Sequence, residues 1–224
     1  MDPEVTIINL GGVNCYLLKS ESSFVLVDTG FPTRRSALLQ KLEKAGCKPG
    51  NLMLIVVTHG DMDHLGNAAF LREKYDTKVA IHPFDAGMVK DGSMGANRKA
   101  KPDRLSLVFK IMMVFTRRLA AKHPVEKFTP DLEIDEGFDL SQYGLDGRVL
   151  HIPGHSKGSI GVLTAKGDLF CGDLFYNIRG FRFVDDLEDY ESSLKKLAGL
   201  KIGTVYPGHG KPFPISRAMT YQAP

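Results

Sequence analysis

A chain of 224 residues, 43% hydrophobic and 25% charged, is long enough to bury a full core as one domain. Its three cysteines are too few and too scattered for a disulfide framework, and its net charge of +3 says little about partners. No apolar run reaches the ~20 residues of a bilayer span, and no signal peptide is visible, so we expect a cytoplasmic protein with no transmembrane segment.

Strands and helices alternate through the first part of the chain. Apolar runs predict strands over 5–8, 14–18, 23–27, 52–57 and 78–82. Helical spacing of apolar residues predicts helices over 34–45 and 64–75. The run at 52–57 is apolar throughout, which is typical of a strand buried on both faces. This order indicates a layered α/β fold.

The alternation lapses at about 84–130, which we interpret as an insertion in a single domain spanning 1–224. Apolar residues three and four apart predict a helix over 103–121. Residues 98–127 hold nine lysines and arginines against two acidic residues. The helix is interpreted as a lid that draws an anionic small-molecule substrate, as a contact with a membrane surface or a second copy of the chain, or as a solvated helix. No motif indicates a nucleic-acid partner.

Strand patterns return after the insertion, over 147–152, 159–164, 168–171 and 202–206, with a helix over 189–200. Each of these strands is followed by glycine or proline, which are typical of turns. The chain therefore continues the same layered α/β pattern to its last strand.

Candidate metal ligands cluster directly after the strand predicted at 52–57. Four such side chains fall within six residues: His59, Asp61, Asp63 and His64. Three more candidates each follow a strand and a glycine: His155, Asp173 and His209. A loop at a strand end lets such side chains converge, whereas a helix would scatter them. Imidazole and carboxylate together suit zinc, iron, manganese or cobalt, so the pattern predicts a two-metal hydrolase centre.

Other chemically capable residues receive ordinary interpretations. His82, His123 and His151 are each isolated in the sequence, and we expect none of them to be a ligand. Asp28 ends an apolar strand before Thr29-Gly30, so we expect it to hydrogen-bond the loops that carry ligands. Four residues that follow ligand positions are interpreted as ordinary loop residues: Lys157, Tyr176, Asn177 and Arg179.

The chain resembles the metallo-β-lactamase fold superfamily of dinuclear hydrolases. The segments that carry the resemblance, spread over about 5–211, are VDTG at 27–30, THGDMDHLG at 58–66, PGHSKGS at 153–159, GD at 172–173 and YPGHG at 206–210. The resemblance implies an α/β fold of four layers, an αββα sandwich of two mixed β-sheets flanked by helices. It also implies a metal centre at one edge of the sheets.

The resemblance implies a role for each candidate ligand. One metal would bind His59, the residue at 61 and His155, the second would bind Asp63, His64 and His209, and Asp173 would bridge the two. Position 61 is aspartate where histidine is usual, and we expect Asp61 to be a direct ligand rather than a residue behind the ligands. We expect zinc, while the extra carboxylate favours manganese or iron relative to a site without it.

The implied reaction is hydrolysis of a small ester, thioester, lactone or phosphoester by a hydroxide that bridges the metals, with Asp63 steering its proton. Glyoxalase II-like thioesterases and acyl-homoserine lactonases are the natural comparisons. The chain stops fifteen residues after His209, short of the helical extension of glyoxalase II, which weighs against glutathione thioesters. Two alternatives stay open: a di-iron redox enzyme of the flavodiiron type, which has a carboxylate at this position but an added flavin domain, and a metal-binding domain without catalysis.

Overall fold

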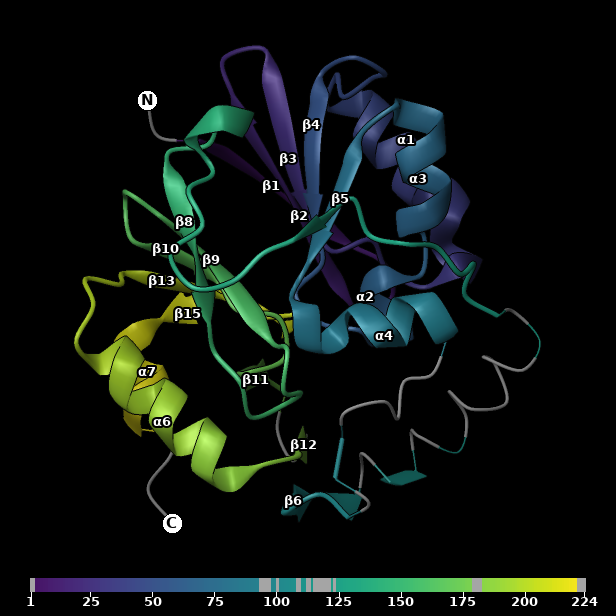
Figure 1. Cartoon of the computed structure of the whole chain (residues 1–224). Helices are drawn as coiled ribbons and strands as arrows, with labels where there is room; N and C mark the ends of the chain where they lie inside the picture. The colour runs from purple at the N-terminus through teal and green to yellow at the C-terminus, as the bar shows by residue number, and fades with distance from the viewer. Residues whose placement is uncertain are drawn as a thin grey trace.

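The structure is a computed structural model, and it describes residues 3–92, 98–99, 101–107, 110–111, 114, 122, 124–178 and 183–220, without the side chains of 219 and 220. Two mixed sheets lie face to face, with helices on their outer faces (Figure 1). None of the described helices is long and apolar enough to cross a membrane. The three cysteines are buried, and all three are free, in agreement with the expectation that they form no disulfide framework.

The first sheet is built mainly from the N-terminal half of the chain. β1 to β3 pair antiparallel, and β3, β4, β5 and β7 pair parallel. Its strands, in spatial order, are β1 (Glu4–Asn9), β2 (Asn14–Ser20), β3 (Ser23–Val27), β4 (Leu52–Val56), β5 (Lys78–Ile81) and β7 (Leu132–Glu133). Helices α1 (Arg35–Lys44) and α3 (Ala68–Tyr75) cover its outer face (Figure 1).

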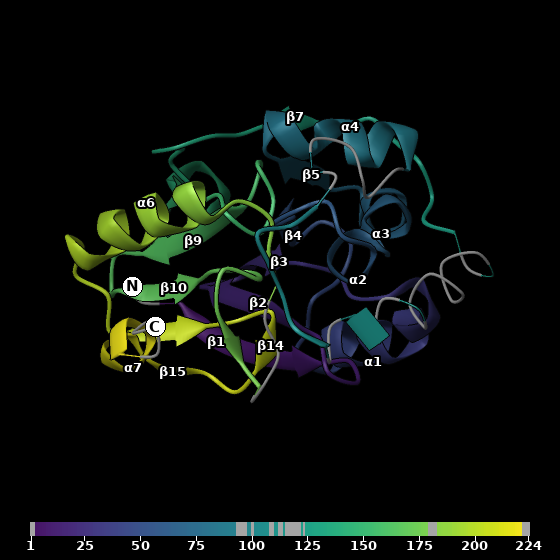
Figure 2. The same cartoon turned by 90° about the horizontal axis from the view of Figure 1, so that it is seen from below.

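The second sheet comes from the C-terminal half. Its strands, in spatial order, are β15 (Phe213–Pro214), β13 (Thr204–Tyr206), β10 (Asp168–Phe170), β9 (Ile160–Thr164) and β8 (Gly147–His151). Only the β10–β13 pair is parallel among these described strands. Helices α6 (Leu187–Ala198) and α7 (Ile215–Thr220) pack on its outer face, on the side of the molecule opposite α1 and α3 (Figure 2).

Alternation along the strands explains the four layers, because successive side chains of a strand point to opposite faces. Leu26 of β3 lies in the apolar cluster shared with α1 and α3, whereas its neighbour Val27 lies in the cluster between the sheets. In β9, Val162 faces that central cluster and Leu163 faces α6 and α7. The predicted αββα sandwich is therefore confirmed.

The helix predicted over 64–75 is interrupted in the structure. A short helix, α2 (Met62–Leu65), ends at Gly66, and α3 begins at Ala68. The Asn67 side chain donates to the carbonyl oxygens of Thr29 and Phe31, at 2.7 and 2.9 Å. These bonds to a loop distant in the sequence break the helix at a point that its apolar spacing does not reveal.

The segment at 84–130 is described only in part. It opens with α4 (Pro83–Asp91), which the sequence pattern did not predict. The helix predicted from 103 begins later, because β6 (Arg104–Leu105) is held in an antiparallel pair with β12 (Phe183–Val184). The described residues between 107 and 122 are helical, while Arg117, Arg118 and His123 lie outside the described residues. The single domain with an insertion, and the role of that insertion, stay predictions.

Candidate metal centre

The loop after β4 holds His59 and Asp61 in place through backbone contacts. Thr58 N–H donates to Asp28 Oδ1 at 2.8 Å, and Gly60 N–H donates to Asp85 Oδ2 at 2.9 Å. Asp61 occupies the N-cap position of α2, so the chain turns into a helix directly after it. Asp63 and His64 therefore lie in one short helix beside the loop that carries His59 and Asp61.

The His155 loop, between β8 and β9, is tied to the same support. Asp85 of α4 is fully buried and accepts hydrogen bonds from Ser156 Oγ at 2.7 Å and from Gly158 N–H at 3.0 Å. Since Asp85 also holds Gly60, one carboxylate fixes the distance between two ligand-bearing loops. Nothing in the sequence around Asp85 indicated this role, because its partners lie 25 and more residues away.

The turns that carry Asp173 and His209 are bonded to each other. Gly208 N–H donates to the Gly172 carbonyl oxygen at 2.7 Å, and Asn14 of β2 donates to the Gly210 carbonyl oxygen at 2.7 Å. A Cβ atom at position 208 would overlap Asp173 Oδ1 and lie 2.6 Å from His64 Cε1. Glycine is therefore required at 208 by the close approach of these side chains.

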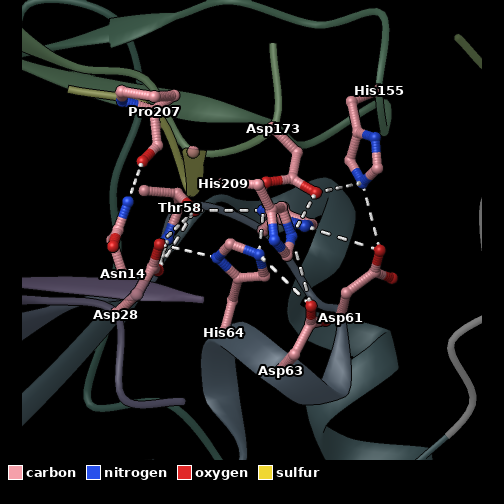
Figure 3. A network of polar contacts seen from close by, with 12 residues as sticks. Asn14, Asp28, Thr58, Asp61, Asp63, His64, His155, Asp173, Pro207 and His209 are labelled. Carbon is pink, nitrogen blue, oxygen red and sulfur yellow. Dashed lines mark hydrogen bonds and ion pairs between the residues drawn. The ribbon is translucent and has the colours of Figure 1, made fainter. Parts of the chain in front are cut away.

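All seven predicted side chains meet at this edge of the sandwich: His59, Asp61, Asp63, His64, His155, Asp173 and His209. Figure 3 labels all of these residues except His59. Asp173 lies between the others. Its Oδ1 is 3.3 Å from His64 Nε2, and its Oδ2 is 3.3 Å from His209 Nε2 and 3.9 Å from His155 Nε2. A carboxylate in this position can contact ions on either side of it.

The atoms form two groups, each with ligand atoms within 4.8 Å of one another. One group is His59, His155 and Asp173, and the other is Asp63, His64 and His209. Asp61 adjoins the first group, because its Oδ2 lies 3.0 Å from His155 Nε2 and 3.5 Å from His59 Nε2. Asp63 Oδ2 lies 3.4 Å from His209 Nε2. This grouping resembles the arrangement that the family resemblance implies, and the ligand roles themselves stay predictions.

Each of the four histidines engages a partner through Nδ1 and turns Nε2 toward the centre. The Nδ1 partners are Thr58 Oγ1 for His59 at 3.0 Å, Asp28 Oδ2 for His64 at 2.8 Å, Tyr176 Oη for His155 at 3.0 Å and the Gly12 carbonyl oxygen for His209 at 2.9 Å. Metal-binding histidines are usually oriented in this way, since a bond at one nitrogen fixes the lone pair on the other.

Several polar atoms at the centre are buried without a hydrogen bond. Within the described part of the chain, His59 Nε2, His64 Nε2 and Asp173 Oδ1 have no hydrogen-bond partner. Leaving such groups unsatisfied costs about 1–3 kcal/mol each, so a fold that retains them needs a compensating ligand. Imidazole nitrogens and carboxylate oxygens in two adjoining groups fit two divalent metal ions.

A family comparison agrees with this geometry. The model of the metallo-beta-lactamase superfamily matches residues 8–209. The chain belongs to the metallo-beta-lactamase superfamily.

Several proteins are similar to this chain over most of its length. A beta-lactamase-like protein 2 homolog of Caenorhabditis elegans is 26% identical over 90% of this chain, which spans 57% of that protein's length. The hydroxyacylglutathione hydrolase GloC of Haemophilus influenzae is 26% identical over 79% of this chain and 73% of its own. A crystal structure of TTHA1623 in a di-iron-bound form has a TM-score of 0.67 and 26% identity, covering 95% of each chain.

The carboxylates of this superfamily centre favour bound positive charge at the second group. Burial opposes protonation of His209, but Asp173 and Asp63 outweigh it and raise the pKa to about 10. Burial likewise opposes protonation of His64, and Asp173, Asp28 and Asp63 raise its pKa well above the usual value. His155 behaves oppositely, because burial and His59 lower its pKa to about 4.

These shifts predict proton release when an ion binds to Asp63, His64 and His209. A pH of about 8 is below the pKa of His209, so the imidazole is protonated and an ion must displace that proton. We expect at least one proton released per ion, and about tenfold tighter binding per pH unit for each proton released. Calorimetric titration in buffers of different ionisation enthalpy measures the number of protons. Binding that releases none at this pH contradicts the charge distribution described.

Tyr176 is a contributor that the sequence interpretation missed. Its hydroxyl lies 3.0 Å from His155 Nδ1 and donates to Asp173 Oδ2 at 3.2 Å, so it connects both of these side chains. Burial and Asp173 raise the pKa of Tyr176 well above its usual value, which keeps the hydroxyl protonated. The available signal was its position three residues after Asp173.

Tyr176→Phe is expected to weaken metal binding about tenfold without unfolding the protein, since partners behind metal ligands typically contribute 10–100-fold. Competition with a chromophoric chelator measures the affinity. Tyr143→Phe, on a half-buried tyrosine that packs against the apolar cluster between the sheets, is the matched control. Equal affinities in both variants would show that the hydroxyl does not orient His155 and Asp173.

A third group within the described residues, His82, Asp135 and His151, also has ligand atoms close together. His82 Nδ1 accepts from Phe84 N–H at 3.1 Å, so the ring carries its proton on Nε2, which contacts Asp135 Oδ1 at 3.0 Å. A protonated nitrogen has no lone pair for a metal. These bonds occupy both ring nitrogens of His82, and that His82 and His151 are not ligands stays a prediction.

Proposed function

We propose that this protein is a metal-dependent hydrolase with two divalent ions, acting on a small ester, thioester, lactone or phosphoester. The observation that supports the proposal is the pair of ligand groups with Asp173 between them, together with the buried atoms at the centre that have no hydrogen-bond partner among the described residues. Bound divalent ions supply a water of lowered pKa, near ~7, and polarise a carbonyl or phosphoryl oxygen.

The side chains at the centre have separate roles in the proposed reaction. His59 and His155 would hold the first ion with Asp61, and His64 and His209 would hold the second with Asp63. Asp173, whose side chain is 4% exposed, is enclosed and suits a bridging role. The Asp63 side chain is more open, at 18% exposed, so one of its oxygens can take the proton of the attacking water. Asp63 is therefore the proposed catalytic residue.

Zinc is the proposed resident metal, because imidazole-rich sites with carboxylates suit it. Iron is the second candidate, since Asp61 adds an oxygen ligand and the relative TTHA1623 is described in a di-iron-bound form. Manganese is favoured by the same carboxylate. A di-iron redox activity of the flavodiiron type is the second candidate function, supported by the same two observations. Retention of metal without turnover would mark a binding domain instead.

A substrate panel tests the proposal. The protein is freed of metal, reloaded separately with zinc, manganese or iron, and assayed with a glutathione thioester, an acyl lactone, an aryl ester and a phosphodiester. The thioester stands first because the relative GloC is named a hydroxyacylglutathione hydrolase. We expect metal-dependent turnover of at least one of the four. Oxygen or nitric oxide reduction by the iron form, with no hydrolysis in any form, would support the redox candidate.

Two further parts of the proposal concern the location of the protein in the cell and its partners. We propose a cytoplasmic location and a small anionic substrate, attracted by the basic residues of 98–127, with no nucleic-acid partner. A homodimer or membrane contact through that segment is the second proposal for it. Sedimentation of the full chain with and without anionic vesicles separates the two, because only a dimer persists without lipid.

A further inference from the structure

Arg98 extends from the basic segment into the candidate metal centre. Its Nη2 donates to Asp61 Oδ1 at 2.7 Å, and the side chains of Arg98 and Asp61 are only 12% and 16% exposed. The guanidinium carbon lies 5.1 Å from the centroid of the Phe183 ring, which belongs to β12. Arg98 Nε is buried and has no hydrogen-bond partner among the described residues. The charge of Arg98 is thus enclosed beside the centre, with Asp61 as its neighbouring carboxylate.

The two oxygens of Asp61 face different partners. Oδ1 accepts the hydrogen bond from Arg98, whereas Oδ2 lies 3.0 Å from His155 Nε2 and 3.5 Å from His59 Nε2. A carboxylate held at one oxygen has its other oxygen fixed in direction, as is usual for metal-binding carboxylates. Arg98 therefore turns Asp61 Oδ2 toward the first ligand group.

The charges of this pair cancel. With Asp61, the centre contains three carboxylates, and Arg98 supplies one enclosed positive charge that is always present. A neutral imidazole at position 61 would need no such partner. It would also leave the guanidinium without its hydrogen-bonded carboxylate, with Nη2 only 3.4 Å from His155 Nε2, one of the proposed ligand atoms. A cation that has lost this partner, at this distance, opposes a metal ion in the first group.

We propose that Arg98 is a positioning residue that enables the first metal position to use a carboxylate, so that Asp61 and Arg98 act together as one neutral ligand unit. The inference rests on the proposed two-ion centre. The inference predicts that a chain with histidine at position 61 binds two ions only when the positive charge at position 98 is also removed.

The test compares metal content in three variants with the wild-type chain. Asp61→His is combined either with Arg98→Met or with Lys99→Met. Lys99 is the matched control, because it carries the same charge on the next residue but forms exposed ion pairs with Asp103 and Asp186, at 2.8 and 3.0 Å. Each protein is loaded with zinc, passed through a desalting column and examined by elemental analysis and chelator competition.

We expect about two ions per chain in the wild type and in Asp61→His/Arg98→Met, and about one in Asp61→His and Asp61→His/Lys99→Met. The first ion position should be weakened about 10–100-fold in the two latter proteins. Two tightly held ions in Asp61→His would overturn the inference. Failure of the added Arg98→Met substitution to restore the ion at the first position would also overturn it. Restoration by Lys99→Met would also overturn it, because a general charge effect would then suffice. A wild type with fewer than two ions contradicts the proposed function itself.

A second measurement needs no metal. Asp61→Asn leaves Arg98 enclosed without its carboxylate, so the Tm of the metal-free variant should be lower than that of the metal-free wild type. Adding Arg98→Met to this variant should raise the Tm again. The isosteric substitution changes the charge with little change in shape. A double variant that melts below Asp61→Asn would overturn the charge pairing, even if the histidine variants failed to fold.

Discussion

Replacement of Asp173 by alanine is expected to lower hydrolysis by about a thousandfold or more, because both ligand groups lose the carboxylate between them. Asp173 approaches His64 on one side and His155 on the other, at 3.3 and 3.9 Å. Without it, two positive ions would face each other with no shared negative charge. The measurements are kcat/KM on the substrate found in the panel and the number of ions per chain.

Asp146→Ala is the control for Asp173→Ala, since Asp146 is an exposed residue before β8. It should leave turnover and metal content unchanged. Circular dichroism should show that both variants are folded. Turnover within a fewfold of the wild type in a folded Asp173→Ala protein would exclude this carboxylate from the reaction.

Asp28→Asn is expected to weaken binding of an ion at His64 about 10–100-fold, although position 28 touches no ion in the proposed centre. Asp28 accepts from Thr58 N–H through Oδ1 at 2.8 Å, and its Oδ2 faces His64 Nδ1 at 2.8 Å. An asparagine that keeps its oxygen on Thr58 offers an N–H to His64 Nδ1. The imidazole proton then moves to Nε2, and the lone pair that would bind the ion is lost.

The backbone should tolerate this substitution. Asp28 has a φ of 62°, in the left-handed region, where asparagine is also accommodated. Asp168→Asn, on a buried residue at the start of β10, is the matched control for removing a buried carboxylate. Affinity measured by chelator competition should fall in Asp28→Asn alone. Equal affinities in the two variants would contradict the role of Asp28 in setting the imidazole tautomer.

Two strands, β3 and β4, were predictable from sequence because the sandwich buries almost all of their side chains, on both faces. β3 was predicted with its observed bounds, and β4 within one residue, since continuous apolar runs leave little choice of structure. The break between α2 and α3 was not predictable. It depends on Asn67 bonding to a loop near Thr29, and apolar spacing carries no record of that contact. The pairing of β6 with β12 is a similar case.

The candidate ligands were predictable for a local reason, whereas their supports were not. Each of His155, Asp173 and His209 follows a glycine at a strand end, a pattern visible within a few residues. Asp85 and Arg98 act across the fold, on partners 25 or more residues away, so only the folded chain brings them to the centre. In the sequence, Asp85 is an ordinary acidic residue of a helix, and Arg98 is one of several basic residues in its segment.

Elemental analysis of the full chain, purified without added chelator, measures whether the two ligand groups hold metal ions. We expect about two transition-metal ions per chain, lost on treatment with chelator and regained on reloading. A folded protein that holds no transition metal and takes up none when it is supplied would exclude the proposed metal centre.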